Sequence, residues 1–471
     1  MRRIFTRPKN PAWTRISATF ILAVLPLGLH AQEDVQGSVP QGQATPNPIY
    51  LSLSDAIQRG LKFNLGLLNS TENSIDVRAQ RLRALSQLLP NVNGNFTESY
   101  NRVNLAAEGF SFKLPANSPF SIPTIVTYPS VDTRGALSQS VFNLQKLRNL
   151  RAADVNVLAA KLSVQDTRDL VVQAVGNAYL LIISDQARID TAKAQTDTSQ
   201  VLFQRAVDLH NAGTAPAIDQ LRAEVQLRTD QQSLLVAQNQ LDKDKIGLGR
   251  VIGLPSGQQF HLSDRLPFAP LDAMTPEAAL AQAFANRADF KAAEERVRAA
   301  VISRGAAVAE YYPTLDFTGN FGDAGSYLTA SHNVFSVAGA VNFPIFTGGR
   351  IRADVEQADV TIRNRRNELG DLRGQIDQEV RTALLDLHSA ADQFAVAQRN
   401  VQLAHETLTQ SRDRFIAGVT DNVEVVQAQQ AVVTADSNLI DATYRHNQAK
   451  IELARALGLA EQNVSRFLLQ K

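Results

Sequence analysis

Short motifs in this chain recur once, in the same order and at a nearly constant separation. Leu254 in the motif Ile252-Gly253-Leu254 matches Leu459 in Leu457-Gly458-Leu459, 205 residues later. Three further pairs keep this order: Gly213 with Gly418 at a separation of 205, Phe142 with Phe346 at 204, and Pro90 with Pro313 at 223. The separation changes only between Pro90 and Phe142, so the first copy carries a longer loop there. This pattern predicts a tandem duplication of one folding unit.

Each copy has the same predicted order of elements. A helix of about 35 residues is followed by two strand-like segments, a helix of about 70 residues, a glycine-containing turn and a helix of nearly 40 residues. The first helices span Leu53–Leu89 and Pro276–Tyr312, the long helices Leu144–Asn211 and Arg350–Ala417, and the last helices Pro216–Ile252 and Asp421–Leu457. Ser54 and Thr275 are the expected N-caps of the first helices.

Apolar residues recur every seven positions along the second long helix. The large series is Val380, Leu387, Phe394, Val401, Leu408 and Phe415, and the small series is Ala383, Ala390, Ala397, Ala404 and Ser411. Such heptads predict a closely packed coiled coil, although the core of an ordinary helical bundle has a similar pattern. A helix of 70 residues is ~105 Å long, and the two shorter helices of a copy match it if they stack end to end. We therefore expect a long rod.

The N-terminus has the pattern of an export signal. A basic segment containing Arg2 and Arg3 precedes the apolar run Ile16–Leu29, and small residues follow near Ala31. This pattern predicts a signal peptide over residues 1–31, with a short anchor helix as the alternative. No other segment is apolar enough to predict a transmembrane helix. The remaining expected divisions are a flexible leader (32–49), a first repeat (50–255), an equatorial linker (256–274), a second repeat (275–460) and a C-terminal tail (461–471).

Four segments alternate between apolar and polar residues over about ten positions, which is typical of strands in an outer-membrane barrel but also of soluble hairpins. They are Asn91–Tyr100, Arg134–Asn143, Thr314–Phe321 and Phe335–Phe343. Leu105–Asp132 is expected to form an outer loop, with the shorter Asp323–Asn333 as its counterpart. Four strands cannot close a barrel, and open strand edges are not tolerated in lipid. Membrane strands would therefore require two chains for eight strands or three chains for twelve.

Composition excludes several classes of protein. The chain has no cysteine, which removes disulfides, thiolate metal sites and a lipid-anchored cysteine. A net charge of +1 gives no basic surface for nucleic acid. The seven histidines show no HExxH spacing, and Gly348-Gly349 is not followed by the lysine of a phosphate-binding loop. We therefore expect no enzyme activity, no cofactor and no metal centre.

Three motifs resemble the TolC family of outer-membrane efflux proteins. They are Leu53-Ser54-Asp55-Ala56-Ile57 at the first helix, Phe343-Pro344-Ile345-Phe346-Thr347-Gly348-Gly349-Arg350 at the strand-to-helix junction, and Phe415-Ile416-Ala417-Gly418 with Val423-Glu424-Val425 at the turn. The resemblance implies a homotrimer with a 12-stranded β-barrel, continued by a long α-helical coiled-coil barrel in the periplasm. It further implies an outer-membrane exit duct of a tripartite efflux pump, with a periplasmic adaptor (membrane fusion) protein and an inner-membrane pump of RND, MFS or ABC type as partners.

The resemblance also assigns roles to particular residues. It implies that Glu424 lines a closed periplasmic aperture, with Asp219 as its counterpart in the first copy. A ring of these carboxylates would favour cations, although both acids also suit the first turn of a helix. Gln427 and Thr420 depart from the family pattern, which has a second acid and, in some members, a gating arginine there. The tip turns expected to contact the adaptor contain Gly213, Thr214, Ala215, Ala417, Gly418 and Val419, and the strand-to-helix junction contains Pro344, Phe346, Gly348 and Gly349.

Two other functions remain open from the sequence. The first is an outer-membrane exit duct of a type I protein secretion system, which would use the same fold. The second is a periplasmic coiled-coil adaptor, which also contains long antiparallel hairpins. An adaptor would usually carry a single hairpin, whereas two hairpins bracket two strand pairs here, so the sequence disfavours it.

Overall fold

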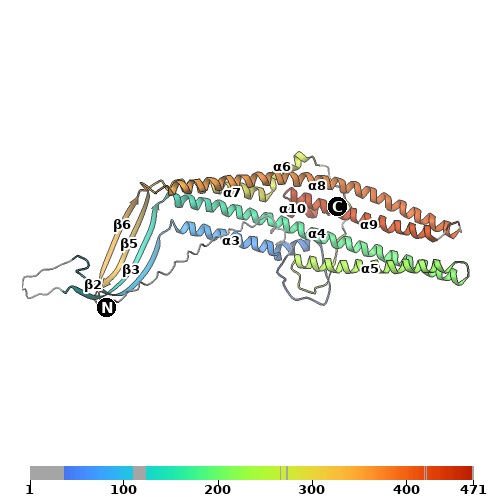
Figure 1. Ribbon diagram of the computed structural model, residues 1–471, viewed down its shortest axis with the longest axis horizontal. Coiled ribbons are helices and arrows are strands. Elements are labelled where there is room, and N and C mark those ends of the chain that lie inside the picture. Colours follow the sequence, from blue (N-terminus) through green and yellow to red (C-terminus); the bar gives the residue numbers. More distant parts are fainter. Residues whose placement is uncertain are drawn as a thin grey trace, which may run out of the picture.

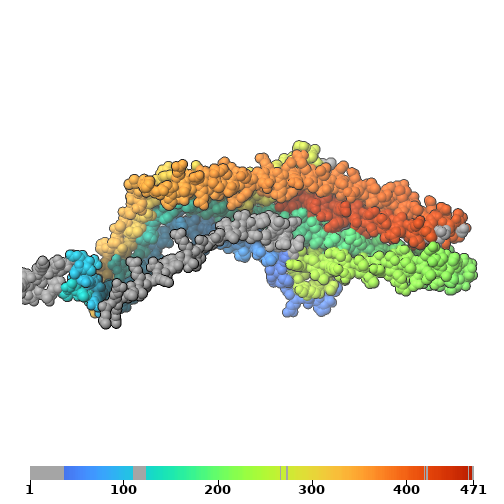
Figure 2. All heavy atoms as spheres, viewed as in Figure 1, coloured from blue at the N-terminus to red at the C-terminus, as the bar shows by residue number. Residues whose placement is uncertain are grey.

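The computed structural model describes residues 37–109, 123–265, 267–271, 274–417, 419–420 and 422–468. These residues form a long rod with a β-sheet at one end and two helical hairpin turns at the other (Figure 1). The same elongated body is seen with all atoms drawn (Figure 2). The predicted signal peptide, residues 32–36 of the leader, residues 110–122 of the predicted outer loop, Gly418 and the last three residues of the tail lie outside the described residues.

The sheet contains four strands in the order β2-β3-β5-β6, and every neighbouring pair is antiparallel. The strands are β2 (Asn91–Asn104), β3 (Ile125–Phe142), β5 (Thr314–Gly325) and β6 (Ser331–Asn342). The outer loop was expected to reach Asp132, but β3 begins at Ile125 and includes Pro129, which is paired with Tyr100. Proline and the weaker alternation of this segment concealed the first part of the strand. Within this sheet, β2 and β6 are the two edges.

Two long helices run the length of the rod, α4 (Leu144–Asn211) and α8 (Arg350–Ile416). The hairpin partner of α4 is α5 (Ala217–Val251), and the partner of α8 is α9 (Asn422–Ala456). Their bounds agree with the predicted helices to within one residue. Four of the small residues of the predicted seam on α8 are buried and Ala404 is half-buried, whereas the large residues beyond the buried Val380 are half-buried beside them. This arrangement brings α8 and α9 close together, as the coiled-coil pattern predicts.

The first helix of each copy is broken, although one continuous helix was expected. The first copy has α2 (Leu53–Phe63) and α3 (Leu65–Ser86), and the second has α6 (Pro276–Asn286) and α7 (Ala288–Ala309). Asn64 breaks the first helix because its extended backbone ends α2, while its side-chain Oδ1 accepts hydrogen bonds from the first N–H groups of α3. Arg287 occupies the equivalent break in the second copy. The N-cap of α2 is Ser52 instead of the expected Ser54, whereas Thr275 caps α6 as predicted.

The breaks let the shorter helices of each copy stack end to end. Gly253 follows the C-cap of α5, and an added Cβ there would lie 2.7 Å from the Phe63 side chain beside the break at Asn64. Gly458 stands two residues after the end of α9, and a Cβ there would lie 2.7 Å from the backbone nitrogen of Arg287. Both glycines have positive φ, +70° and +69°, and they occupy matching positions of the two copies. Each junction therefore needs a residue without a side chain.

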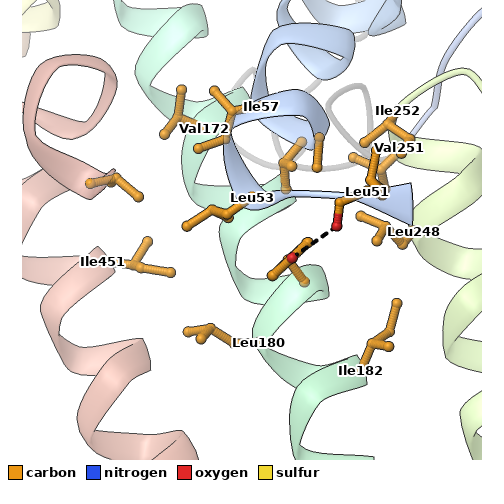
Figure 3. Packing of buried hydrophobic residues seen from close by; sticks show 14 of the residues in the cluster. Leu51, Leu53, Ile57, Val172, Leu180, Ile182, Leu248, Val251, Ile252 and Ile451 are labelled. Carbon is orange, nitrogen blue, oxygen red and sulfur yellow. Dashed lines mark hydrogen bonds between the residues drawn. The ribbon is translucent and has the colours of Figure 1, made fainter. Parts of the chain in front are cut away.

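A hydrophobic core lies where these junctions meet the middle of α4. Leu51 belongs to β1 (Ile49–Leu51), which pairs in parallel with β4 (Phe260–Leu262) from the predicted linker. The hydroxyl of Tyr179 on α4 donates a 3.0 Å hydrogen bond to the carbonyl of Leu51 (Figure 3). The C-terminal segment contributes a further helix, α10 (Ala460–Leu468), which packs on α4 and α9. These elements form an extra layer on the middle of the rod.

The apolar part of α4 belongs to this core. α4 contains an 18-residue window with a mean hydropathy of 1.2, which is long and apolar enough to cross a membrane. The sequence analysis expected no such helix beyond the signal, and on length and composition that expectation is wrong. Half of the window is buried inside the molecule, because α2, α5, α9 and α10 all pack against α4. Val171, Val172 and Val175 are fully buried there.

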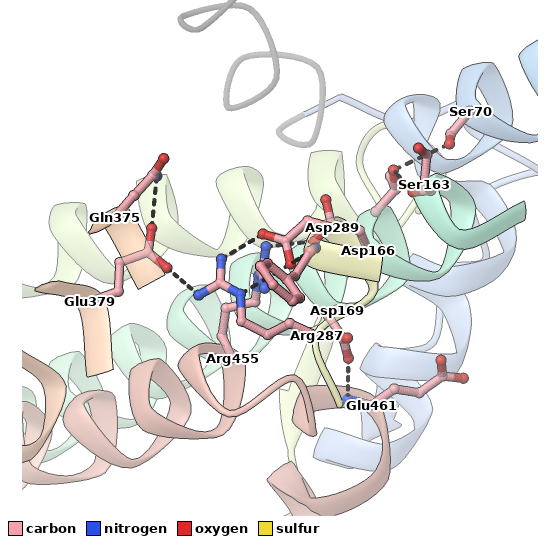
Figure 4. A network of polar contacts seen from close by, with 12 residues as sticks. Ser70, Ser163, Asp166, Asp169, Arg287, Asp289, Gln375, Glu379, Arg455 and Glu461 are labelled. Carbon is pink, nitrogen blue, oxygen red and sulfur yellow. Dashed lines mark hydrogen bonds and ion pairs between the residues drawn. The ribbon is translucent and has the colours of Figure 1, made fainter. Parts of the chain in front are cut away.

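A buried ion-pair network holds the second junction (Figure 4). The side chain of Arg287 is only 2% exposed. Its guanidinium donates to both carboxylate oxygens of Asp289, at 3.0 and 2.6 Å, and to Glu379 on α8. Because a buried guanidinium needs nearly all its donors satisfied, this residue fixes the start of α7 against α8.

The same network ties the second copy to the first. Arg455 at the end of α9 pairs with Asp166 on α4 at 2.6 Å. Burial raises the pKa of Asp166 to about 6, against the lowering effect of Arg455. One turn further on, the Asp169 carboxylate accepts a 2.9 Å hydrogen bond from the backbone N–H of Glu461 on α10. The end of α9 and the start of α10 are therefore both anchored on α4.

We predict that Gly458→Ala destabilises the protein, whereas Gly247→Ala does not. The alanine at 458 would require a positive φ and would press on the Arg287 backbone, which costs roughly 1–3 kcal/mol. Gly247 is a matched control, because it lies inside α5 and a Cβ there meets nothing within 4 Å. Unfolding followed by circular dichroism tests this prediction. Equal midpoints for the two variants would contradict the close junction.

Candidate channel aperture at the helical tips

The two tip turns use the same backbone hydrogen bonds at positions 205 residues apart. In the first turn, the N–H of Thr214 donates to the carbonyl of Leu209 at 3.0 Å, and Gly213 has φ +71°. In the second turn, the N–H of Val419 donates to the carbonyl of Arg414, also at 3.0 Å. This six-residue bond ends a helix tightly and turns the chain back. The turns therefore place the first residues of α5 and α9 at the end of the rod.

Glu424 lies in the first turn of α9 and contacts α8 across the hairpin. Its carboxylate accepts hydrogen bonds from the hydroxyl of Ser411, at 3.3 Å, and from the hydroxyl of Thr420. The guanidinium of Arg414 lies 3.3 Å from Oε1 of the same carboxylate. The Glu424 side chain is 35% exposed. It therefore both closes the tip turn and keeps part of its charge at the surface, where the helix N-terminus favours a negative group.

Asp219 has the corresponding place in the first turn of α5, but its contacts are simpler. Its carboxylate lies 3.6 Å from the guanidinium of Arg222, one turn along the same helix. The Asp219 side chain is 27% exposed, and no described contact ties it to α4. The two predicted acids are thus placed alike by the fold, whereas only Glu424 joins the two helices of its hairpin.

The other predicted tip residues are mostly at the surface. Gln427 is exposed one turn beyond Glu424. Thr420 is half-buried, and its hydroxyl donates a hydrogen bond to the Glu424 carboxylate. Gly213, Thr214, Ala417 and Val419 are exposed, while Ala215 is half-buried beside His210. Gly418 lies outside the described residues. Sequence reasoning did not assign Arg414 to the aperture and placed Ser411 only in the helical seam. Both belong to the last turns of α8 and come near Glu424 only because the chain folds back.

The strand-to-helix junction lies at the opposite end of α8. Gly348 and Gly349 have φ of +60° and +88°, so the motif needs glycine at both positions to turn from β6 into α8. Arg350 then pairs with Glu310 near the end of α7, at 2.6 Å. The Phe346 side chain is exposed, as is Ile345, and Pro344 is half-buried. The junction thus presents apolar side chains where the sheet meets the helices.

Comparison with known proteins identifies this architecture. The family described as "Outer membrane efflux protein" matches residues 76–254 and 279–459. The chain belongs to this family. It is 25% identical over 431 residues to the probable efflux pump outer membrane protein SepC of Pseudomonas putida, covering 88% of this chain and 84% of that protein. It is 26% identical to the cation efflux system protein CusC of Escherichia coli, over 66% of this chain and 69% of that protein.

The fold agrees with solved outer-membrane channels. The CmeC outer membrane channel of Campylobacter jejuni superposes with a TM-score of 0.73 at 16% identity, covering 92% of this chain and 94% of that chain. Family membership confirms the resemblance stated from the sequence motifs, the outer-membrane location and the expected class of efflux transport. The family consists of transport proteins, not enzymes.

At the tip, we predict that Arg414→Gln loosens the second turn. Losing a half-exposed ion pair of this kind costs up to about 1 kcal/mol, so amide hydrogen exchange over residues 411–425 should quicken about two- to fivefold. Exposed Arg412, two residues away, is the control, because the described contacts to Glu424 come from residues 411, 414 and 420. Equal exchange in Arg414→Gln and Arg412→Gln would show that Arg414 does not hold the turn.

Proposed function

We propose that three copies of this chain close into one tube, which forms the exit duct of a tripartite efflux pump. The tube would consist of a 12-stranded barrel in the outer membrane and a helical barrel in the periplasm. The observation that carries this proposal is that the chain is a strip with the same two open edges along its whole length.

At the membrane level, the open edges are β2 and β6. Their outer N–H and C=O groups have no partner strand in the described sheet. In lipid such groups cannot find water, so a membrane sheet must close on itself. Pairing β2 of one copy with β6 of the next satisfies both edges. Two copies give a barrel filled by its own side chains, whereas three give twelve strands with room for a passage.

In the half of the rod next to the sheet, the packing order is α3-α4-α7-α8. The first-copy edge, α3, carries an exposed series at seven-residue spacing, formed by Leu68, Ile75 and Leu82. Such a series normally faces another helix. The other edge is α8, where Val360 is exposed. A neighbouring copy would cover both.

In the half next to the tips, the packing order is α5-α4-α9-α8, because α5 and α9 stack beneath α3 and α7. The edge helices again carry exposed apolar residues. They are Ile218, Leu221, Val225 and Leu235 on α5, and Leu385, Val396 and Leu403 on α8. The first-copy edge and the α8 edge thus stay on the same sides from the sheet to the tips. Head-to-tail contact between unlike edges forms a closed ring when the rotation fits.

The tips would form the aperture of this tube. Three copies bring three Glu424 and three Asp219 side chains to one end, with Thr420 and Gln427 beside them. Such a ring of carboxylates favours cations and binds divalent ions. The exposed apolar turn residues Ile416 and Val419 supply a contact surface for a periplasmic adaptor, which would join the duct to an inner-membrane pump. SepC is described as part of an efflux pump and CusC as part of a cation efflux system, which supports these partners.

Single-channel recording in planar bilayers tests the proposal. The wild-type protein should conduct weakly, and millimolar Mg²⁺ should reduce the current further. Glu424→Gln removes the charge at nearly constant shape, so it should weaken Mg²⁺ binding at the aperture, relieve the Mg²⁺ block and thereby raise the conductance measured in Mg²⁺. Glu406→Gln is the control, because Glu406 is an exposed acid on α8 away from the turn. Inserted oligomers whose Mg²⁺ block is unchanged by Glu424→Gln would contradict the carboxylate aperture.

A further inference from the structure

Between the core and the tips, one arginine joins the two hairpins of the chain. Arg188 on α4 pairs with Asp441 on α9 through a 2.6 Å contact and with Asp185, on its own helix, at 3.2 Å. No other ion pair between the two hairpins is found in this part of the described rod. Arg188 lies 23 positions before the end of α4, or about 35 Å from the tip. The pair is therefore placed to control how far the hairpins separate.

Asp185 is an unusual partner for this arginine. Its side chain is only 2% exposed, and its Oδ2 atom has no hydrogen-bond partner in the described structure. The residue lines a groove of about 520 Å³ between α4 and α5. A buried carboxylate with one unsatisfied oxygen is costly when charged, whereas a protonated carboxyl could donate a hydrogen bond from that oxygen.

The groups around Asp185 come from three helices. They are Arg188 on α4, Asp244 on α5, and Asp441 and Tyr444 on α9, with Glu452 beyond Tyr444. Asp244 itself accepts a 2.8 Å hydrogen bond from Gln240. It lines a second groove, which is larger than the one beside Asp185. With all three aspartates charged, the cluster holds three negative groups against one arginine. Removing one proton therefore changes the electrostatic forces that act between α4, α5 and α9.

We propose that Asp185, Asp244, Arg188 and Asp441 form a proton-sensitive latch that holds the two hairpins of each copy together. With a proton on Asp185, its carboxyl can donate a hydrogen bond toward Asp244, so α4 and α5 stay close and Arg188 is free to hold Asp441. Without that proton, the two carboxylates repel each other, and charged Asp185 draws Arg188 away from α9. Loss of the proton thus releases the second hairpin and favours opening of the tips. This inference rests on the proposed channel function.

The pH range follows from the surroundings of Asp185. Burial, and next to it Asp244, raise the pKa of Asp185 to about 7 in the folded protein. Because this pKa is above that of an exposed aspartate, the closed packing gains from the proton and weakens as the pH rises through 7. If the pKa of Asp185 differs by about one unit between the closed and open states, the ratio of closed to open channels changes about tenfold across this pH range.

The test compares the open fraction of the reconstituted full-length channel at pH 6 and pH 8. Wild type should open about tenfold more at pH 8. Asp185→Asn, which mimics the protonated form, should stay at the pH 6 level throughout. Asp244→Asn should move the midpoint to lower pH, because it removes the negative neighbour of Asp185. Asp441→Asn should open more at both pH values, because Arg188 loses its partner on α9.

Two controls separate the latch from other titrating groups. Asp392→Asn changes an exposed pair on α8, and Glu424→Gln changes the tip; both should keep the wild-type pH response. A pH response that survives in Asp185→Asn, or one that disappears in Glu424→Gln, would overturn the latch while leaving the channel intact. Inserted protein that conducts at neither pH in any of these variants would overturn the channel function on which the latch depends.

Discussion

The unpaired backbone of β2 and β6 is the constraint on which the rest of this structure depends. A four-stranded sheet leaves two rows of N–H and C=O groups open, and the hydrocarbon of a membrane offers them no water. In the tube that we propose, further copies of the chain pair with both edges. This closure would fix which sides of the chain must match, because the helices continue from the same strands without changing edges. The apolar residues exposed along α3, α5 and α8 follow those edges.

The two junctions in the middle of the rod, where α5 meets the break at Asn64 and α9 meets the break at Arg287, keep this strip four helices wide over its whole length. Asn64 and Arg287 interrupt the first helix of each copy, so that α2 and α6 leave the rod while α3 and α7 remain in it. Gly253 and Gly458 then allow α5 and α9 to end directly against those breaks. The two copies solve the same geometric problem with different chemistry. The first uses a capping asparagine, and the second uses a buried arginine held by carboxylates.

Much of this fold could be predicted from the sequence, since its main signals are periodic. The bounds of α4 and α8 follow from long stretches without proline and from heptads, and the duplication follows from motif spacing. The breaks at Asn64 and Arg287 could not be predicted, because each lies within a good helical pattern, and Arg287 acts through contacts with Glu379 on α8 and with Gly458. The early start of β3 was hidden by Pro129. At the tip, the aperture role of Glu424 stays a prediction from its motif, and Arg414 comes near it only because the chain folds back. Asp185, farther from the tip, could not be singled out from the sequence, because its neighbour Asp244 lies on another helix.

Disulfide cross-linking between the two edges tests ring closure most directly, because the native chain has no cysteine. Ion pairs and hydrogen bonds across the rod run from Arg81 to Asp154, from Arg148 to Gly305 and from Arg304 to Asp359, so they place Leu82 and Val360 at similar heights on opposite edges. Leu82→Cys with Val360→Cys should give, on oxidation in membranes, a covalent ladder that stops at three chains, and neither single variant should cross-link. Monomers alone, or a ladder that continues beyond three, would contradict a closed ring of three copies.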